Sequence, residues 1–172
     1  IDTWYSQNMT SYSSYLLDNG FCNDRSLYSG SGYSSPMTDY MSSRRQNLYK
    51  PSYTCPNETR DLFTTASASK GNKSLTYPVA MITLDEAMIA GLIYTTTNYD
   101  ITNYLKSNYT YWTMSPNYTR NGSAYVYDIN PQGGYYSWYV DSPGHYAVRV
   151  ITLKSTSTVS SGTGTYDNPY VI

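Results

Sequence analysis

The chain contains a single histidine, His145, so any catalytic arrangement built on an imidazole has to use it. Asp141 and Ser142 are its neighbours, but all three share one tight turn and cannot form the geometry that joins a nucleophile, a base and its orienting carboxylate. We therefore expect His145 to be a loop residue that contacts only solvent or a ligand. Two carboxylates ~5–9 Å apart could hydrolyse a glycosidic bond, and Asp128 and Asp141 are the pair to consider. We expect them instead to hydrogen-bond to a ligand or to turn amides.

The residue pattern does not predict a His- or Cys-based metal site or a phosphate-binding loop. The sequence has no cluster of His or Cys residues with the spacing of a metal site. A calcium site made of scattered Asp, Asn and carbonyl groups stays open, although no EF-hand spacing is present. Gly133-Gly134 marks a turn, because no helix begins after it to hold a phosphate. We predict no cofactor and no catalytic residue.

Tyrosine is the residue whose abundance most suggests a function. The chain has 23 tyrosines and only 2 phenylalanines. Tyrosine offers a large, stiff and amphipathic contact surface, for which antigen-binding loops use it together with Ser, Gly and Asn. The alternative is a sheet whose exposed face tolerates tyrosine as a good strand former. The residues that we expect to form a recognition surface, for a sugar or a protein epitope, are Tyr118, Arg120, Asn121, Tyr127, Asp128, Gln132, Tyr135, Tyr136, Trp138, Tyr139, Asp141 and His145.

Composition limits the classes of protein to consider. The 172 residues fit one domain, and 13% of them are charged with a formal net charge of -1. There is no basic stripe for nucleic acid and no apolar run of ~18 residues for a membrane span. Solubility that depends on Ser, Thr, Asn and Tyr suits an extracellular protein. We find no signal-peptide pattern within these residues, and because the chain opens at Ile1 without a methionine we expect it to be an excised or processed fragment.

The two cysteines, Cys22 and Cys55, are most simply a disulfide that closes a loop rich in Ser, Gly and Tyr. Two buried thiols in a reducing compartment are the alternative. The bridged segment, from Phe21 to about Asn57, shows no periodicity and is predicted to be a long loop.

Two helices are predicted. Tyr5, Met9, Tyr12 and Leu16 are spaced as one helical face, with Asp2 as a cap and Asn19-Gly20 as a stop. The second begins at Thr83, where Thr83 and Glu86 form a capping box, and ends at Gly91.

The remaining elements are predicted to be strands joined by turns. We expect strands over 79–82, 111–116, 123–129, 135–140, 146–153 and 169–172, with 123–153 as an antiparallel meander. Its plausible inward residues are Ala124, Val126, Tyr136, Trp138, Val140, Val148 and Val150.

Several blocks in fixed order resemble one bacterial family: Phe21-Cys-Asn-Asp-Arg25, Cys55-Pro, Asp61-Leu-Phe-Thr-Thr65, 70–78, 82–86, Tyr111-Trp-Thr-Met-Ser-Pro116, Ala124-Tyr-Val126, Leu153-Lys-Ser155 and 162–169. The family is a domain of unannotated function at the C-terminal end of surface proteins from Gram-positive bacteria, many with a type IV pilin-like N-terminal helix. The Trp-x-x-Ser-Pro block followed by Ala-Tyr-Val also resembles the C-type-lectin-like fold of formylglycine-generating enzymes. The catalytic cysteine and copper site of those enzymes have no counterpart after Tyr111, so this resemblance implies a scaffold without catalysis.

The resemblance implies an α+β, C-type-lectin-like domain in which two helices flank an antiparallel sheet with long loops and one disulfide. It implies a location at the bacterial cell surface and adhesion to a host or microbial surface protein or glycan. Folds of this type also serve as variable proteins of diversity-generating retroelements, and 117–146 is rich in the residues that adenine mutagenesis produces. The first rival is a structural minor pilin that packs against other subunits in a filament, and the second is a glycan hydrolase that uses Asp128 and Asp141.

Overall fold

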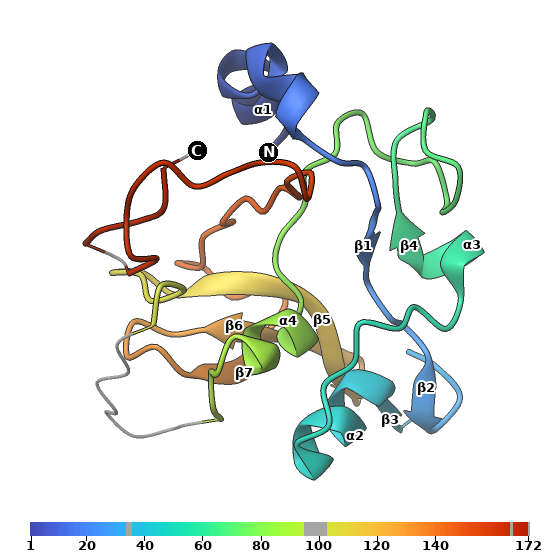
Figure 1. Ribbon diagram of the computed structural model, residues 1–172. Helices are drawn as coiled ribbons and strands as arrows, with labels where there is room; N and C mark the ends of the chain where they lie inside the picture. Colours follow the sequence, from blue (N-terminus) through green and yellow to red (C-terminus); the bar gives the residue numbers. More distant parts are fainter. Residues whose placement is uncertain (34–35, 95–102, 166, 172) are drawn as a thin grey trace.

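A computed structural model describes residues 1–33, 36–94, 103–165 and 167–171. They form an α+β fold with two antiparallel sheets (Figure 1). The larger sheet has the order β2-β3-β5-β6-β7. Its strands are β2 (Leu27–Ser29), β3 (Met37–Tyr40), β5 (Tyr111–Arg120), β6 (Ser123–Ile129) and β7 (Tyr135–Tyr139). The smaller sheet pairs β1 (Phe21–Cys22) with β4 (Leu62–Phe63).

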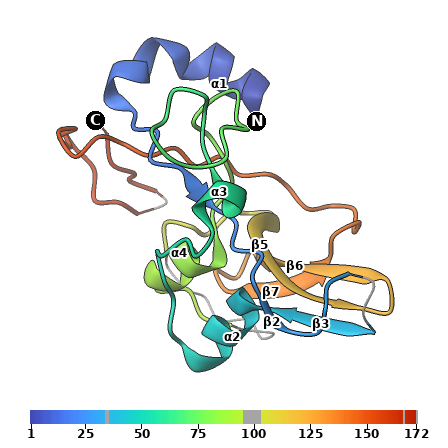
Figure 2. The same cartoon turned by 90° about the vertical axis from the view of Figure 1, so that its right-hand side faces the viewer.

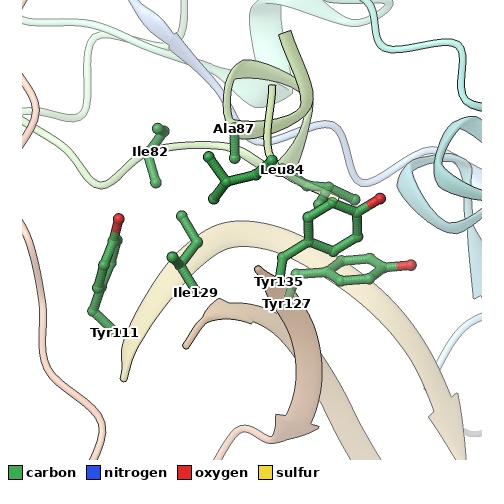
Figure 3. Packing of buried hydrophobic residues seen from close by; sticks show 8 residues of the cluster. Ile82, Leu84, Ala87, Tyr111, Tyr127, Ile129 and Tyr135 are labelled. Carbon is green, nitrogen blue, oxygen red and sulfur yellow. The ribbon is translucent and has the colours of Figure 1, made fainter. Parts of the chain in front are cut away.

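Two helices cover one face of the larger sheet, α2 (Met41–Leu48) and α4 (Leu84–Ile89). Between α4 and the sheet lies the main core, in which Leu84, Ala87 and Ile129 are fully buried. Figure 3 shows Tyr127 and Tyr135 of this core on one side of Ile129 and Tyr111 on the other. In Figure 2, α1 (Asp2–Asn8) lies at the opposite end of the molecule from the larger sheet, with α3 (Glu58–Asp61) between them.

The helix predicted at Thr83 is confirmed. The Thr83 hydroxyl accepts a hydrogen bond from the Glu86 amide at 3.1 Å, and Glu86 Oε2 accepts one from the Thr83 amide at 2.8 Å. This reciprocal pair satisfies two amides that the first turn leaves free. Gly91, with φ +93°, follows the last turn as predicted.

The helix predicted near the N-terminus is shorter than expected. α1 ends at Asn8, and Thr10–Tyr15 continues as the 3-10 helix η1. Asp2 is the first residue of α1, and the N-cap is Ile1, without a side-chain cap. Ser6 and Thr10 donate their hydroxyl groups to backbone carbonyls three and four residues earlier, a competition that weakens helices.

The prediction of a long loop over 21–57 is wrong in part, because this segment contains β2, β3 and α2. α2 attaches to the fold through polar groups. Arg45 donates to Asp85 at 2.6 and 2.7 Å and to Asp24 at 2.7 Å, and the Ser42 hydroxyl donates to the Pro116 carbonyl. A helix that docks through such contacts has no apolar periodicity to reveal it in the sequence.

The predicted disulfide between Cys22 and Cys55 is confirmed, with 5.7 Å between the Cα atoms. It connects β1 to the segment before α3. Asn57 caps α3 by accepting from the Arg60 amide at 3.1 Å. These contacts hold the smaller sheet and α3 together, although neither has many apolar residues.

Strands β5, β6 and β7 confirm the three predicted in this region, but β5 extends to Arg120. The segment 146–153 is not a strand. It makes isolated bridges to three different segments, at Tyr146 with Tyr111, Val150 with Ala80 and Leu153 with Leu16. Within the described part of the chain, segment 79–82 likewise has only the bridge at Ala80. In the last predicted strand, 169–172, Val171 forms an isolated bridge with Ser161, and residue 172 lies outside the described residues. Apolar alternation there reflects packing against separate parts of the core.

The predicted inward face of the meander is wrong except at Val150, which is half-buried and packs against the main core. Tyr127, Ile129 and Tyr135 are buried, whereas Trp138, Val140 and Val148 are exposed and Ala124, Val126 and Tyr136 are half-buried. The face that becomes the interior is the one on which α2 and α4 dock. Strand alternation alone cannot tell which face that is when both carry large side chains.

Among the described residues, no helix has the length and apolar character needed to cross a membrane.

Candidate functional site

Three tyrosines from three adjacent strands form a continuous row of rings, here called the tyrosine row: Tyr118, Tyr125 and Tyr139. They are direct cross-strand partners. The ring centroids of Tyr118 and Tyr125 are 4.1 Å apart, and those of Tyr125 and Tyr139 are 4.4 Å apart. A bulge in β5 between Pro116 and Tyr118 brings Tyr118 opposite Tyr125. Stacked cross-strand aromatic pairs stabilise a sheet and fix the orientation of each ring.

The row ends in polar groups at its β3 side. Asp39 is the cross-strand partner of Tyr118, and its Oδ2 accepts a hydrogen bond from the Ser29 hydroxyl at 2.7 Å. At the other end Tyr139 is 41% exposed. A hydrogen bond with Tyr125 raises the pKa of the Tyr139 phenol. The row therefore combines phenol hydroxyls with one carboxylate, that of Asp39.

Tyr127 and Tyr135 do not belong to the surface that the sequence predicted. They are 1% and 0% exposed and lie in the core beneath α2 and α4. Burial raises the pKa of both phenols, that of Tyr135 to about 12. Both residues act in packing, and no ligand on the surface can reach them.

The other predicted residues are spread over four places. Trp138 and Tyr136 pair with Val126 and Asp128, so they lie on the sheet face opposite the tyrosine row. Arg120 and Asn121 are exposed at the tight β5–β6 turn, where Asn121 and Gly122 have positive φ. The remaining two lie in other turns: Gln132 beyond the far end of β6 and Asp141 after β7.

The expectation that His145 contacts only solvent or ligand is wrong. Its Nε2 lies 2.9 Å from Asp128 Oδ2, and its ring stacks on Trp112 with the centroids 3.9 Å apart. The side chains of His145 and Asp128 are 11% and 6% exposed. Backbone bonds between Tyr146 and β5, at Trp112 and Thr110, hold the histidine segment against the strand. The partner of His145 is thus 17 residues away in sequence, whereas the sequence analysis considered only the neighbours of His145 in its own turn.

This His–Asp pair has the carboxylate and imidazole of a catalytic triad but lacks its third member. Within the described part of the chain, His145 Nδ1 and Asp128 Oδ1 are buried and have no hydrogen-bond partner, so no hydroxyl lies where a nucleophile would. Burial raises the pKa of Asp128, although the bond with His145 opposes the shift. Asp128 is buried and engaged with His145, whereas Asp141 is exposed in the turn after β7. The His–Asp pair fastens the segment after β7 to the sheet.

No group of three or more His, Cys, Asp or Glu side chains that could hold a metal ion occurs among the described residues. Comparison of the chain with protein-family models, curated proteins and solved structures finds no match. The function therefore has to be argued from the surface itself.

Sequence reasoning placed Tyr118 and Tyr139 in the site but did not assign Tyr125 or Asp39 to it. Tyr125 belongs to the tyrosine-rich stretch, which was a usable signal. Its role as the middle ring depends on the β5 bulge, which shifts the register by one residue and is not visible in the sequence. Asp39 comes from β3, a strand in the predicted long loop.

Proposed function

We propose that this domain is a non-catalytic recognition module of a bacterial surface protein, and that the tyrosine row is its contact surface. The observation that carries the proposal is the contact between three tyrosine rings from three strands, one pair stacked at 4.1 Å and the other tilted at 4.4 Å between centroids. Their mutual contact fixes the rings before any partner binds, so binding costs little side-chain entropy. Tyr139 is substantially exposed, so packing of the hydrophobic core does not explain why its ring lies in this row.

The geometry of the row favours a protein epitope over a glycan. Tyr125 lies between two rings, stacked with Tyr118 at an interplanar angle of 23° and tilted against Tyr139 at 38°, so its faces are less open to a sugar than those of an isolated ring. A sugar binds aromatic residues by stacking on a free ring face, whereas the row presents ring edges, hydroxyls and the Asp39 carboxylate. Edges and hydroxyls suit the mixed polar and apolar surface of a folded protein.

The finer assignments from the resemblance belong to this proposal. A five-stranded antiparallel sheet, long connecting segments and one disulfide are compatible with a C-type-lectin-like fold. The disulfide suits an extracellular location at the bacterial surface. Mutational variation over the whole of 117–146 would be restricted, because Asn117, Tyr127, Asp128 and Tyr135 are buried there. A variable protein would have to place its diversity at the exposed positions of this stretch.

The test begins with a screen of the purified domain on protein and glycan arrays. Affinities for the best binder are then measured for Tyr139→Ala, Tyr118→Ala and Trp138→Ala. Trp138 is the matched control, because it is a neighbouring exposed aromatic residue on the opposite face. Loss of a hot-spot tyrosine should weaken binding by ~1–3 kcal/mol, and Trp138→Ala should change it little.

Three results would overturn the proposal. One is a weaker affinity for Trp138→Ala with normal affinity for both tyrosine variants. Another is a selective glycan binder. The third is self-association of the domain in light scattering that Tyr139→Ala abolishes, which would favour the structural filament subunit instead.

A further inference from the structure

A groove of about 390 Å³ lies where the smaller sheet and α3 meet the larger sheet. It lies on the face opposite the tyrosine row, because its floor includes the cross-strand pair Pro116 and Val126, which continues to Trp138. Leu27, Met114, Pro116 and Val126 form its apolar part, and Asn23, Tyr40 and two arginines add polar groups to the lining. The lining side chains that matter here are Leu27, Tyr40, Met114, Pro116 and Val126, with Arg25 and Arg60.

The two arginines share one buried carboxylate. Arg25 Nε lies 2.8 Å from Asp61 Oδ1, and Arg60 Nη2 lies 2.6 Å from Asp61 Oδ2. Asp61 is 0% exposed, whereas the arginine side chains are 43% and 47% exposed. Burial alone would raise the pKa of Asp61, but the hydrogen bonds from Arg60 and Arg25 outweigh it and lower the pKa. Asp61 is thus ionised at neutral pH, and the pair of guanidinium groups retains an excess positive charge.

The guanidinium groups also have hydrogen-bonding capacity to spare. Arg25 uses Nε for Asp61 and Nη2 for the Arg60 carbonyl, and Arg60 uses Nε and Nη2 for Asp61. No partner for the Nη1 groups is found within the described residues. Guanidinium groups fixed in this way are well suited to bind a second carboxylate.

We propose that this groove is a second binding site, which takes a peptide segment of a partner protein that presents a carboxylate next to an apolar side chain. The carboxylate binds between Arg25 and Arg60, and the apolar side chain lies on Met114, Pro116 and Val126. The site does not depend on the tyrosine row, so either can exist without the other.

The chemistry of the lining separates this occupant from other anions. An acidic sugar carries hydroxyl groups on every side, and burying them against Met114, Pro116 and Val126 would leave them without partners. A nucleic acid needs an extended row of cations, and the net charge of the chain is -1. A carboxylate beside a hydrocarbon group satisfies both parts of the groove.

Leu27 offers a matched pair of variants that leave the Asp61 ion pairs intact. It lines the groove from β2 and is 43% exposed, so polar substitutions there are compatible with folding. Leu27→Glu places a competing carboxylate beside the arginines, and Leu27→Gln has the same shape without the charge. Arg25→Gln removes one cation, while Asp61 keeps both of its bonds to Arg60.

The experiment is an NMR titration of the ¹⁵N-labelled domain with N-acetylphenylalanine, its uncharged amide and glucuronate. We expect millimolar binding of N-acetylphenylalanine, with shifts at the amides of Arg25, Leu27 and Val126, and much weaker binding of the other two. Leu27→Glu should weaken binding of the acid by about tenfold or more, and Leu27→Gln should weaken it less. Arg25→Gln should remove the preference for the acid over the amide.

Equal binding of the acid and the amide would overturn the carboxylate assignment. Tighter binding of glucuronate would overturn the peptide assignment in favour of an acidic glycan. The absence of any shift in the groove, with the spectrum otherwise unchanged, would overturn the site itself.

Discussion

Asp61→Asn provides the sharpest test of the electrostatic reasoning. The carboxylate of Asp61 is fully buried and accepts hydrogen bonds from Arg25 and Arg60. An asparagine in its place would turn an amide donor toward these cations and leave them unpaired. Removing one partner of a buried ion pair costs ~3–5 kcal/mol, but both arginines are almost half exposed and can be hydrated again. We therefore expect a loss of roughly 1–3 kcal/mol in the free energy of unfolding at pH 7.

The pH dependence follows from the lowered pKa of Asp61. A carboxyl group whose pKa is lower in the folded than in the unfolded state stabilises the fold above the unfolded value of ~4. This contribution is lost as the pH falls through the lower folded value. The difference in stability between the wild type and Asp61→Asn should therefore be largest near neutral pH and shrink in acid.

Urea unfolding of both proteins at a series of pH values from neutral to acid measures this difference directly. Asp141→Asn is the control, since Asp141 is exposed in the turn after β7. It should leave the stability close to that of the wild type at each pH. A stability difference for Asp61→Asn that is absent at neutral pH, or that grows in acid, would refute the ion-pair account.

Three further changes test other parts of the fold. His145→Ala should lower the free energy of unfolding by ~1–3 kcal/mol, because it leaves Asp128 buried without its partner. Faster hydrogen exchange at the Tyr146 amide would show that the segment after β7 is released, and unchanged exchange would contradict the fastening role of His145. Thr83→Ala should cost ~1 kcal/mol in urea unfolding by removing the cap of α4, and Thr83→Ser should retain most of it; equal losses would argue against the hydroxyl. Replacement of Cys22 and Cys55 by serine should cost ~3–4 kcal/mol, measured in the same way, and a variant as stable as the wild type would show that the bridge constrains little.

Local sequence signals were sufficient where neighbouring residues supply the whole interaction. The capping box joins Thr83 and Glu86 within one turn, so its geometry follows from their spacing. The β6 and β7 strands are bounded by Asn, Pro and Gly residues that can only form turns, and both were predicted close to their observed limits. The disulfide followed from the presence of just two cysteines.

Sequence-based predictions were wrong where an element or side chain is held by residues that are distant in sequence. α2 docks through Arg45 to Asp24 and Asp85, which come from other segments, so its own sequence carries no apolar stripe. The partner of His145 is Asp128 on a different element, so reasoning limited to neighbours in sequence left the histidine without a partner in the protein. Segment 146–153 alternates like a strand but contacts a different neighbour at each bridge.

The abundance of tyrosine in this chain was readable from its sequence, but the division of those tyrosines between core and surface was not. Tyr125 and Tyr127 lie two residues apart on the same side of β6, yet Tyr127 is buried and Tyr125 is part of the row. Tyr127 belongs to the core cluster that contains Leu84 and Ala87 of α4, whereas Tyr125 lies outside this cluster, and the β5 bulge places Tyr118 opposite Tyr125. Side-chain chemistry is local, whereas solvent exposure depends on what the rest of the chain places above each residue.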